Sequence, residues 1–186
     1  AFNGTGAARY EASLDGAAYA PATSPVTLTG LGEGAHTFAV RAIDAAGNVD
    51  ATPAAYTWTV DTVAPATPAV PTTPATITST TTPAVSGTAE AGSTVTIYVD
   101  GTAVGTATAD GAGCWSYTIA DALSEGAHGI TITSRDAAGN TSPRSSALTI
   151  TIDMTAPAAL AIASITSTGV SGTAEAGSTV EVFNGS

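Results

Sequence analysis

The sequence repeats itself over long stretches. The ten residues Ser86–Val95 occur again, letter for letter, at Ser171–Val180. A second block returns with a constant shift of 92 residues. Its copies are Glu33–His36 with Asp44–Asn48, and Glu125–His128 with Asp136–Asn140. A fixed long period is typical of arrays of similar modules, in which function resides in the repetition and at the joints. The repeats therefore favour a structural array over an enzyme.

The charge balance excludes several classes of partner. Fifteen acidic residues face four arginines, and the net charge is −11. Nucleic acids and anionic lipids need a cationic surface, so we expect neither as a partner. No apolar run approaches the roughly 18 residues of a membrane span, so we expect no membrane insertion. No signal peptide opens the chain, and Ala1–Gly4 resembles the interior of a sequence, so we expect a fragment of a longer protein.

Strand signals dominate the chain. Thr94–Val99 alternates polar and apolar residues and then meets Asp100-Gly101, a two-residue hairpin signal. No stretch shows a helical period, so the chain is predicted to be all-β. Seven strands are expected, at 75–79, 84–89, 94–99, 102–108, 114–119, 129–134 and 147–152. Seven short strands in a segment of this length predict a two-sheet immunoglobulin-like β-sandwich with Trp115 as its core anchor.

The repeats divide the chain into three parts. Residues 62–153 form a complete module, 1–61 the C-terminal part of one, and 154–186 the N-terminal strands of a further one. Residues 154–182 and 2–61 together number 89, close to the 92 of the complete module, and 183–186 resemble 2–5. We therefore interpret the chain as one period of a two-module array. Prolines at 65, 68, 71 and 74 predict an extended, stiff connector between modules.

Several motifs carry a family resemblance. Ser86–Val95, Asp110–Trp115, Asp136–Asn140 and Asp153–Pro157 resemble the bacterial Ig-like repeats of giant surface adhesins and biofilm proteins. The match covers Pro65–Ser186, and the N-terminal part resembles a related Ig-like repeat. The resemblance implies an extracellular or bacterial cell-surface location, neighbouring repeats as partners, and calcium bound near module junctions by aspartates. Cys114 departs from the pattern, which commonly has Asn there.

Three acidic residues are candidates for a metal site at one joint. In an Ig-like sandwich the second–third and sixth–seventh strand loops lie at the end where the chain enters. Glu90 lies in the first of these loops and Asp136 opens the second, so both are expected to face the connector that carries Asp61. Hard oxygen ligands at such a joint suit Ca²⁺, which takes six to eight oxygens.

A second candidate joint follows from the same reasoning. Asp153 and Glu175 should meet the equivalent loop aspartate, which is Asp44 of the next unit if the period holds. The alternative is that all these acids are hydrogen-bonded loop caps, because Asp before Ala-Ala-Gly-Asn is also a turn former. Both alternatives stay open on the sequence.

Other polar residues are assigned simpler roles. Asp100 and Asp110 precede glycine in hairpins and are expected to be turn formers. His36 and His128 have no second histidine or cysteine nearby in sequence, which disfavours a transition-metal site. The single cysteine, Cys114, cannot form an intramolecular disulfide and is expected to point outward. No nucleophile elbow or phosphate-binding loop is present, and no catalytic residue is predicted.

Two functions remain in competition. The first is a stalk or fibre of tandem Ig-like modules with calcium-stiffened joints, built from neighbouring repeats or copies of the same chain. Any host or matrix ligand would then be bound through other regions. The alternative is a module that binds a glycan or host protein through its own surface, which calls for exposed aromatic residues. Tyr10 and Tyr19 are the candidates, because Trp58 and Trp115 fall at core-facing strand positions.

Overall fold

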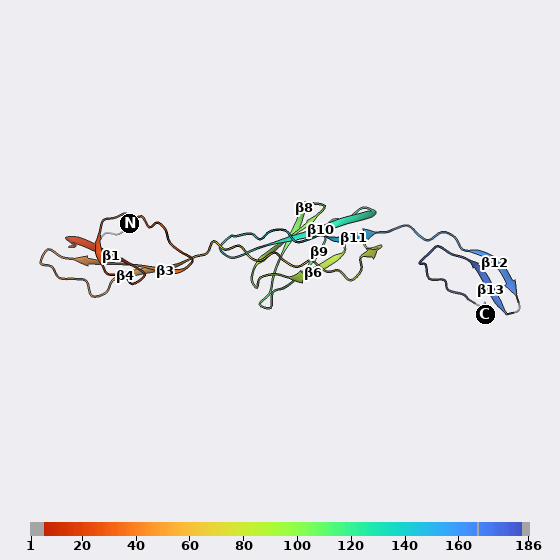
Figure 1. Ribbon diagram of the computed structural model, residues 1–186, viewed down its shortest axis with the longest axis horizontal. Coiled ribbons are helices and arrows are strands. Elements are labelled where there is room, and N and C mark those ends of the chain that lie inside the picture. The colour runs from red at the N-terminus through yellow and green to blue at the C-terminus, as the bar shows by residue number, and fades with distance from the viewer. Residues whose placement is uncertain (1–5, 167, 184–186) are drawn as a thin grey trace. The chain divides into compact units, whose positions relative to one another are not determined.

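The computed structural model describes residues 6–166 and 168–183, and Figure 1 labels most of their strands. The described residues form thirteen strands and no helix, in agreement with the predicted all-β class. Correspondingly, this part of the chain contains no helix long and apolar enough to cross a membrane. The chain divides into two compact units, one of Ala1–Pro65 with Asp136–Thr141 and one of Ala66–Arg135 with Ser142–Ser186.

The module predicted over residues 62–153, called the complete module below, contains seven strands in two sheets. Its strands are β5 (Ile77–Thr78), β6 (Ala84–Thr88), β7 (Thr94–Val99), β8 (Thr102–Thr108), β9 (Cys114–Thr118), β10 (Gly126–Arg135) and β11 (Leu148–Ile152). The first sheet has the order β5-β11-β10-β7-β8, and β6 pairs with β9 in the second. All seven predicted strands are therefore present, and their arrangement is that of an Ig-like sandwich.

The core of this module lies between the two sheets. Alternate residues of β7 and β10 point inward, so Val95, Ile97, Ile130 and Ile132 are fully buried. Trp115, on β9 of the other sheet, is only 4% exposed and packs in the same cluster. Burying one such aliphatic side chain contributes about 1.5–3 kcal/mol. The period-2 pattern of the sequence is thus the direct cause of the two-layer packing.

The first strand of the module differs from its predicted form. Thr72 forms an isolated bridge with Ser86 of β6, and the chain then crosses to β11, with which β5 pairs in parallel. The segment predicted as one strand over 75–79 is therefore a short strand that has changed sheets. Pro71 is fully buried, so this proline belongs to the sandwich as well as to the predicted connector.

The first unit contains a single four-stranded sheet. Its strands β1 (Arg9–Leu14), β2 (Ala20–Ala22), β3 (Gly34–Ile43) and β4 (Ala54–Val60) have the order β2-β1-β3-β4. The residue range of β3 coincides with that of β10 after a shift of 92 residues, and the range of β1 coincides with that of β7 after a shift of 85. Among the described residues, this unit has no strand at the positions of β6 and β9.

One face of the four-stranded sheet is therefore incompletely covered. Phe38 and Val40 correspond to Ile130 and Ile132, yet they are only half-buried. Tyr56 of β4 is 72% exposed. The first unit therefore presents, partly open, the face that the complete module buries.

The last part of the chain contains a hairpin of β12 (Ala161–Thr166) and β13 (Gly169–Thr173). β13 becomes β6 when shifted by 85 residues, as the repeated sequence requires. Apolar side chains are exposed here, including Ile165 at 71% and Phe183 at 82%.

Two segments of the chain correspond to the position of β7. The repeat places Val180–Phe183 at the position of β7, which β1 already occupies in the first unit. The interpretation of the chain as one period of a two-module array stays a prediction. The resemblance between residues 2–5 and 183–186 lies almost entirely outside the described residues.

Candidate functional site

Asp136 begins the turn that joins β10 to β11. Its Oδ1 accepts the backbone N–H groups of Gly139 at 2.7 Å and Asn140 at 2.8 Å. Its Oδ2 accepts the side-chain amide of Asn140 at 2.9 Å. Burial raises the pKa of Asp136, but these hydrogen bonds outweigh it and hold the pKa below the usual value. The aspartate therefore caps its own turn.

Asp44 repeats this geometry in the loop that joins β3 to β4. Its Oδ1 accepts the N–H groups of Ala46 and Asn48, both at 2.9 Å, and its Oδ2 accepts the Asn48 side-chain amide at 2.8 Å. The side-chain bond from Asn48, followed by its backbone bond, lowers the pKa of Asp44. The turn-forming interpretation thus has its hydrogen bonds at both positions. Oδ2 of each aspartate accepts only one of these bonds, so it still carries a second lone pair that could bind a cation.

Asp61 lies close to Asp136 through a shared neighbour. The Asn140 amide nitrogen lies 3.0 Å from the carbonyl oxygen of Asp61 and 3.4 Å from its Oδ1. The same nitrogen bonds Asp136 Oδ2, so three oxygen atoms of two aspartates converge on one amide group. Asp61 Oδ1 also accepts the N–H of Val63 at 3.1 Å, which closes an Asx turn. Two of the three residues predicted for this joint are therefore brought together.

Glu90 is placed differently. It is exposed in the turn between β6 and β7, where its carbonyl accepts the N–H of Ser93 at 3.0 Å. Across residues 6–166 and 168–183, no three His, Cys, Asp or Glu residues form a group that could hold a metal ion. Instead of Glu90, the side-chain amide of Asn140 contacts the oxygen atoms of Asp61 and Asp136, and the sequence analysis did not consider this residue.

The residues of the second predicted joint are engaged locally. Asp153 Oδ1 accepts the N–H of Thr155 at 3.0 Å, the same Asx turn that Asp61 makes. Glu175 Oε2 accepts the N–H of Ala158 at 3.1 Å, within the last part of the chain. Their expected partner, Asp44, belongs to a following unit in that prediction, so the meeting of the three stays a prediction.

Two glutamates that the sequence reasoning missed hold the segments after the modules. Both carboxylate oxygens of Glu33 accept the N–H of Thr62, at 3.0 and 3.1 Å, and the Thr62 hydroxyl also donates to Glu33. These bonds, the hydroxyl's first, lower the pKa of Glu33. Glu125 accepts the hydroxyl of Thr155 at 2.6 Å. The glutamate–threonine pairing could have been predicted from the sequence. The Glu-Gly-Ala-His block recurs, and each copy is followed by an Asp-Thr or Asp-Met-Thr segment that carries the bonded threonine.

The simpler assignments can also be placed. Asp100 has a left-handed backbone conformation at its hairpin, with φ 49°, and Asp110 Oδ1 accepts two backbone N–H groups of its own turn. Cys114 is exposed, as predicted. Tyr19 packs under the guanidinium of Arg41, whose carbon lies 4.1 Å from the ring centroid. That contact gives Tyr19 a structural role, while ligand binding by Tyr10 or Tyr19 stays a prediction.

Comparison with protein families identifies one match. Residues 72–154 match the family model described as a bacterial Ig-like domain. This range includes all seven strands of the complete module. No curated protein matches the chain.

Comparison with solved structures gives several similar chains. The fibronectin(III)-like modules of CbhA from Clostridium thermocellum are 19% identical, with a TM-score of 0.49 over 82% of this chain and 81% of that one. A tetra-tandem repeat from the extending region of a large adhesion protein is 22% identical, with a TM-score of 0.45 over 88% and 47%. A Ca²⁺-stabilized adhesin that helps an Antarctic bacterium bind ice is 32% identical, with a TM-score of 0.36 over 76% and 40%. This chain spans less than half of each of the two adhesion proteins.

Proposed function

We propose that this chain, whose residues 72–154 match the family model of a bacterial Ig-like domain, is a stretch of a stalk or fibre in a bacterial cell-surface or extracellular protein. The observation that carries the proposal is repetition at the level of strands. β1 and β3 stand where β7 and β10 stand, and β13 stands where β6 stands. Sequence that repeats whole structural units, joints included, is typical of proteins that provide length and stiffness.

The partners in this proposal are neighbouring Ig-like repeats or further copies of the chain, in a head-to-tail array. The partly open face of the first unit and the exposed apolar residues near β12 and β13 support it. Large apolar side chains in such numbers are costly to leave in water, and a neighbouring repeat would cover them. A host or matrix ligand would then bind elsewhere in the protein.

The joints in this proposal are stiffened by Ca²⁺. The net charge of −11 makes like-charged modules repel each other, and a divalent cation would oppose that repulsion. Asp61 and Asp136 offer carboxylate and carbonyl oxygens around Asn140, and an asparagine amide can rotate to present its own oxygen. This donor set is of the hard-oxygen kind that Ca²⁺ prefers.

The remaining predicted ligands extend the same proposal. Glu90 would join Asp61 and Asp136 at one joint. Asp153 and Glu175 would meet Asp44 of a following unit at the next. Ca²⁺ when bound would supply a positive charge shared between modules, while the turn hydrogen bonds of each aspartate hold its carboxylate in place.

Thermal unfolding of the full chain in excess calcium and then in chelator tests the calcium joint. A saturated site at ~100 times its dissociation constant would stabilise the folded state by about 2.7 kcal/mol, or several degrees in midpoint. The Asp61→Asn/Asp136→Asn variant should lose this rise, because asparagine keeps the turn acceptor and removes the charge. Asp110→Asn is the matched control, since Asp110 caps a turn away from the joint.

The outcomes separate the two interpretations of the acids. A midpoint that calcium does not change would reduce Asp61 and Asp136 to turn formers. Small-angle scattering of the same samples tests the stalk, because a stiffened chain should lengthen in calcium. A chain whose maximum dimension stays constant would contradict joint stiffening.

A further inference from the structure

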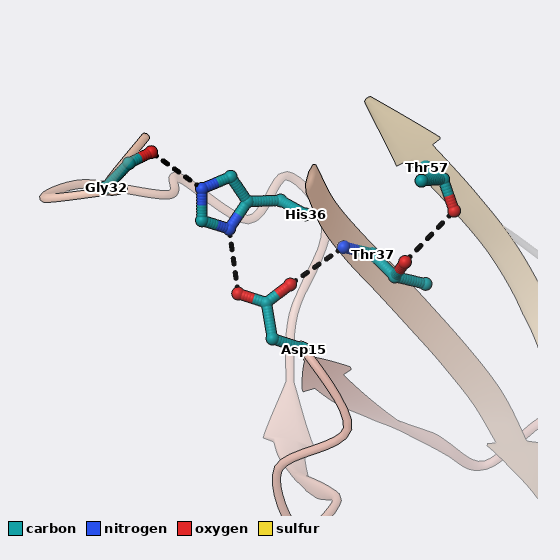
Figure 2. A network of polar contacts seen from close by, with 5 residues as sticks. All are labelled: Asp15, Gly32, His36, Thr37 and Thr57. Atoms are coloured by element: carbon teal, nitrogen blue, oxygen red, sulfur yellow. Dashed lines mark hydrogen bonds and ion pairs between the residues drawn. The ribbon is translucent and has the colours of Figure 1, made fainter. Parts of the chain in front are cut away.

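His36 lies between two acceptors in the first unit. Figure 2 shows its ring between the carboxylate of Asp15 and the carbonyl of Gly32. Nδ1 lies 2.8 Å from Asp15 Oδ2, and Nε2 lies 2.9 Å from the Gly32 oxygen. The other oxygen of Asp15 accepts the backbone N–H of Thr37 at 2.8 Å. The side chain thus joins the β1–β2 turn to the loop that precedes β3.

The complete module contains the same network. His128 Nδ1 lies 2.7 Å from Asp100 Oδ2, and Nε2 lies 3.0 Å from the carbonyl oxygen of Ser124. Asp100 Oδ1 accepts the N–H of Gly129 at 2.8 Å. Asp15 and Asp100 both adopt left-handed backbone conformations, with φ 54° and 49°. Two independent copies with the same atoms and nearly the same distances indicate a built feature.

The geometry selects one protonation state. A neutral imidazole has one N–H donor and one lone pair, so it can satisfy only one of two acceptors. In each network both ring nitrogens face acceptors, a carboxylate and a carbonyl, and only the doubly protonated ring donates to both. The Ser124 hydroxyl also lies 3.5 Å from His128 Nε2, farther than the 3.0 Å of the carbonyl oxygen. The bond to the Gly32 carbonyl, followed by the bond to Asp15, raises the pKa of His36. For His128 the bond to Asp100 comes first and that to Ser124 second, with the same direction for its pKa.

The loop that each histidine holds also holds the segment leaving the module. Gly32 is followed by Glu33, which accepts the N–H of Thr62 directly after β4. Ser124 is followed by Glu125, which accepts the hydroxyl of Thr155 after β11. A positive φ at Gly34 and Gly126, 112° and 121°, turns each loop back so that the histidine reaches the carbonyl four residues earlier. The same loop therefore accepts a hydrogen bond from the histidine ring and holds the start of the connector, so the protonation of the ring is linked to the connector.

We propose that His36 and His128 are proton-binding sites that fasten the start of each connector, so that the connector loosens when the imidazolium loses its proton. The surroundings of the rings leave one charged partner each. Asp15 is hydrogen-bonded to His36. From β4, the uncharged ring of Trp58 lies with its centroid 5.8 Å from that of His36, and the carboxylate of Glu33 is bonded to Thr62 instead. Asp100 bonds His128, and the residue opposite it on β11 is Ile150.

The direction of the effect follows from the signs of the shifts. Because folding raises the pKa of both histidines, their stabilisation is complete below the unfolded value of about 6.5 and is lost as pH rises through the folded value. Folding lowers the pKa of Asp15 and Asp100, chiefly through the histidine bonds, so their contribution is lost only in acid, as pH falls through the lowered values. The networks are therefore strongest in mildly acidic solution and weaken toward alkaline pH.

NMR titration of the full chain from pH 5 to 9 tests the proposal. The chain has only two histidines, so His36→Gln assigns both ring signals. Both rings should titrate above 6.5. Amide exchange at Thr62, corrected for the intrinsic pH dependence of exchange, should lose protection with the midpoint of His36. In His36→Gln, that protection should be lower and should no longer follow pH.

Two variants provide internal controls. Asp100→Asn should lower the midpoint of His128 and leave that of His36 unchanged, while Asp110→Asn should move neither. Titration of the wild-type rings at or below 6.5 would overturn the protonation state. Protection at Thr62 that does not track His36 would overturn the link to the connector.

Discussion

Gly105 occupies a position where an added methyl group has no room. It lies on β8, and Tyr117 reaches toward it from β9 of the opposite sheet. The Tyr117 hydroxyl donates to the carbonyl of Val104 at 2.8 Å. A Cβ on residue 105 would overlap that hydroxyl and would lie 2.6 Å from Cε2 of the ring. We therefore expect Gly105→Ala to displace Tyr117.

The magnitude follows from three contributions. Overpacking costs about 1–3 kcal/mol, and loss of the tyrosine hydrogen bond costs about 1 kcal/mol. Alanine in a strand recovers ~0.5–1 kcal/mol relative to glycine. The net loss of unfolding free energy should be about 1–3 kcal/mol. In a Tyr117→Ala background the clash is absent, and Gly105→Ala should be neutral or slightly stabilising.

Urea unfolding of the four chains of this double-mutant cycle measures the effect. A Trp58→Phe background leaves Trp115 as the only tryptophan, and it reports on the complete module alone. Gly111→Ala is the matched control, because a Cβ there meets nothing within 4 Å. The reasoning fails if Gly105→Ala is as stable as the parent, or if its cost persists after Tyr117 is removed.

Three further predictions concern the core, the connector and pH. Ile130→Ala should cost about 2–5 kcal/mol because the side chain is fully buried, whereas Ile165→Ala at an exposed position should stay within about 0.5 kcal/mol in the same urea assay. Thr62→Val should move the pKa of Glu33 back up toward its usual value, as measured by carboxyl NMR, because the hydroxyl is the largest cause of its lowering. His128→Gln should flatten the fall in unfolding midpoint between pH 6 and 8.5, since the raised pKa of His128 is one source of that fall.

The strands of the complete module could be predicted because their signal is local. The bounds of β7 and β8 agree with the predicted 94–99 and 102–108, and the alternation in Thr94–Val99 marks the buried face as well. The first strand was predicted less well. This segment pairs with β6 at Thr72 and then with β11. The change of sheet depends on hydrogen bonds to those two strands, and the sequence of the segment itself does not reveal which strands will lie beside it.

The candidate sites were predicted in part. Asp44 and Asp136 could be identified as turn residues because the residues that bond them follow within four positions. The histidine networks were missed because Asp15 lies 21 residues from His36 and Asp100 lies 28 from His128. This difference of seven residues between the two spacings also concealed that the networks repeat.

The all-β class, the repeats and the excess of acidic residues could all be predicted from the sequence, because alternation, repetition and composition are properties of the chain before it folds. Only the tertiary structure decided which polar groups meet. It set Asn140 between Asp61 and Asp136, and each histidine between a turn aspartate and a loop carbonyl. The physical reason is that a side-chain hydrogen bond requires its two atoms to lie within about 3 Å, and only the pairing of strands and the closure of loops brings residues distant in sequence that close.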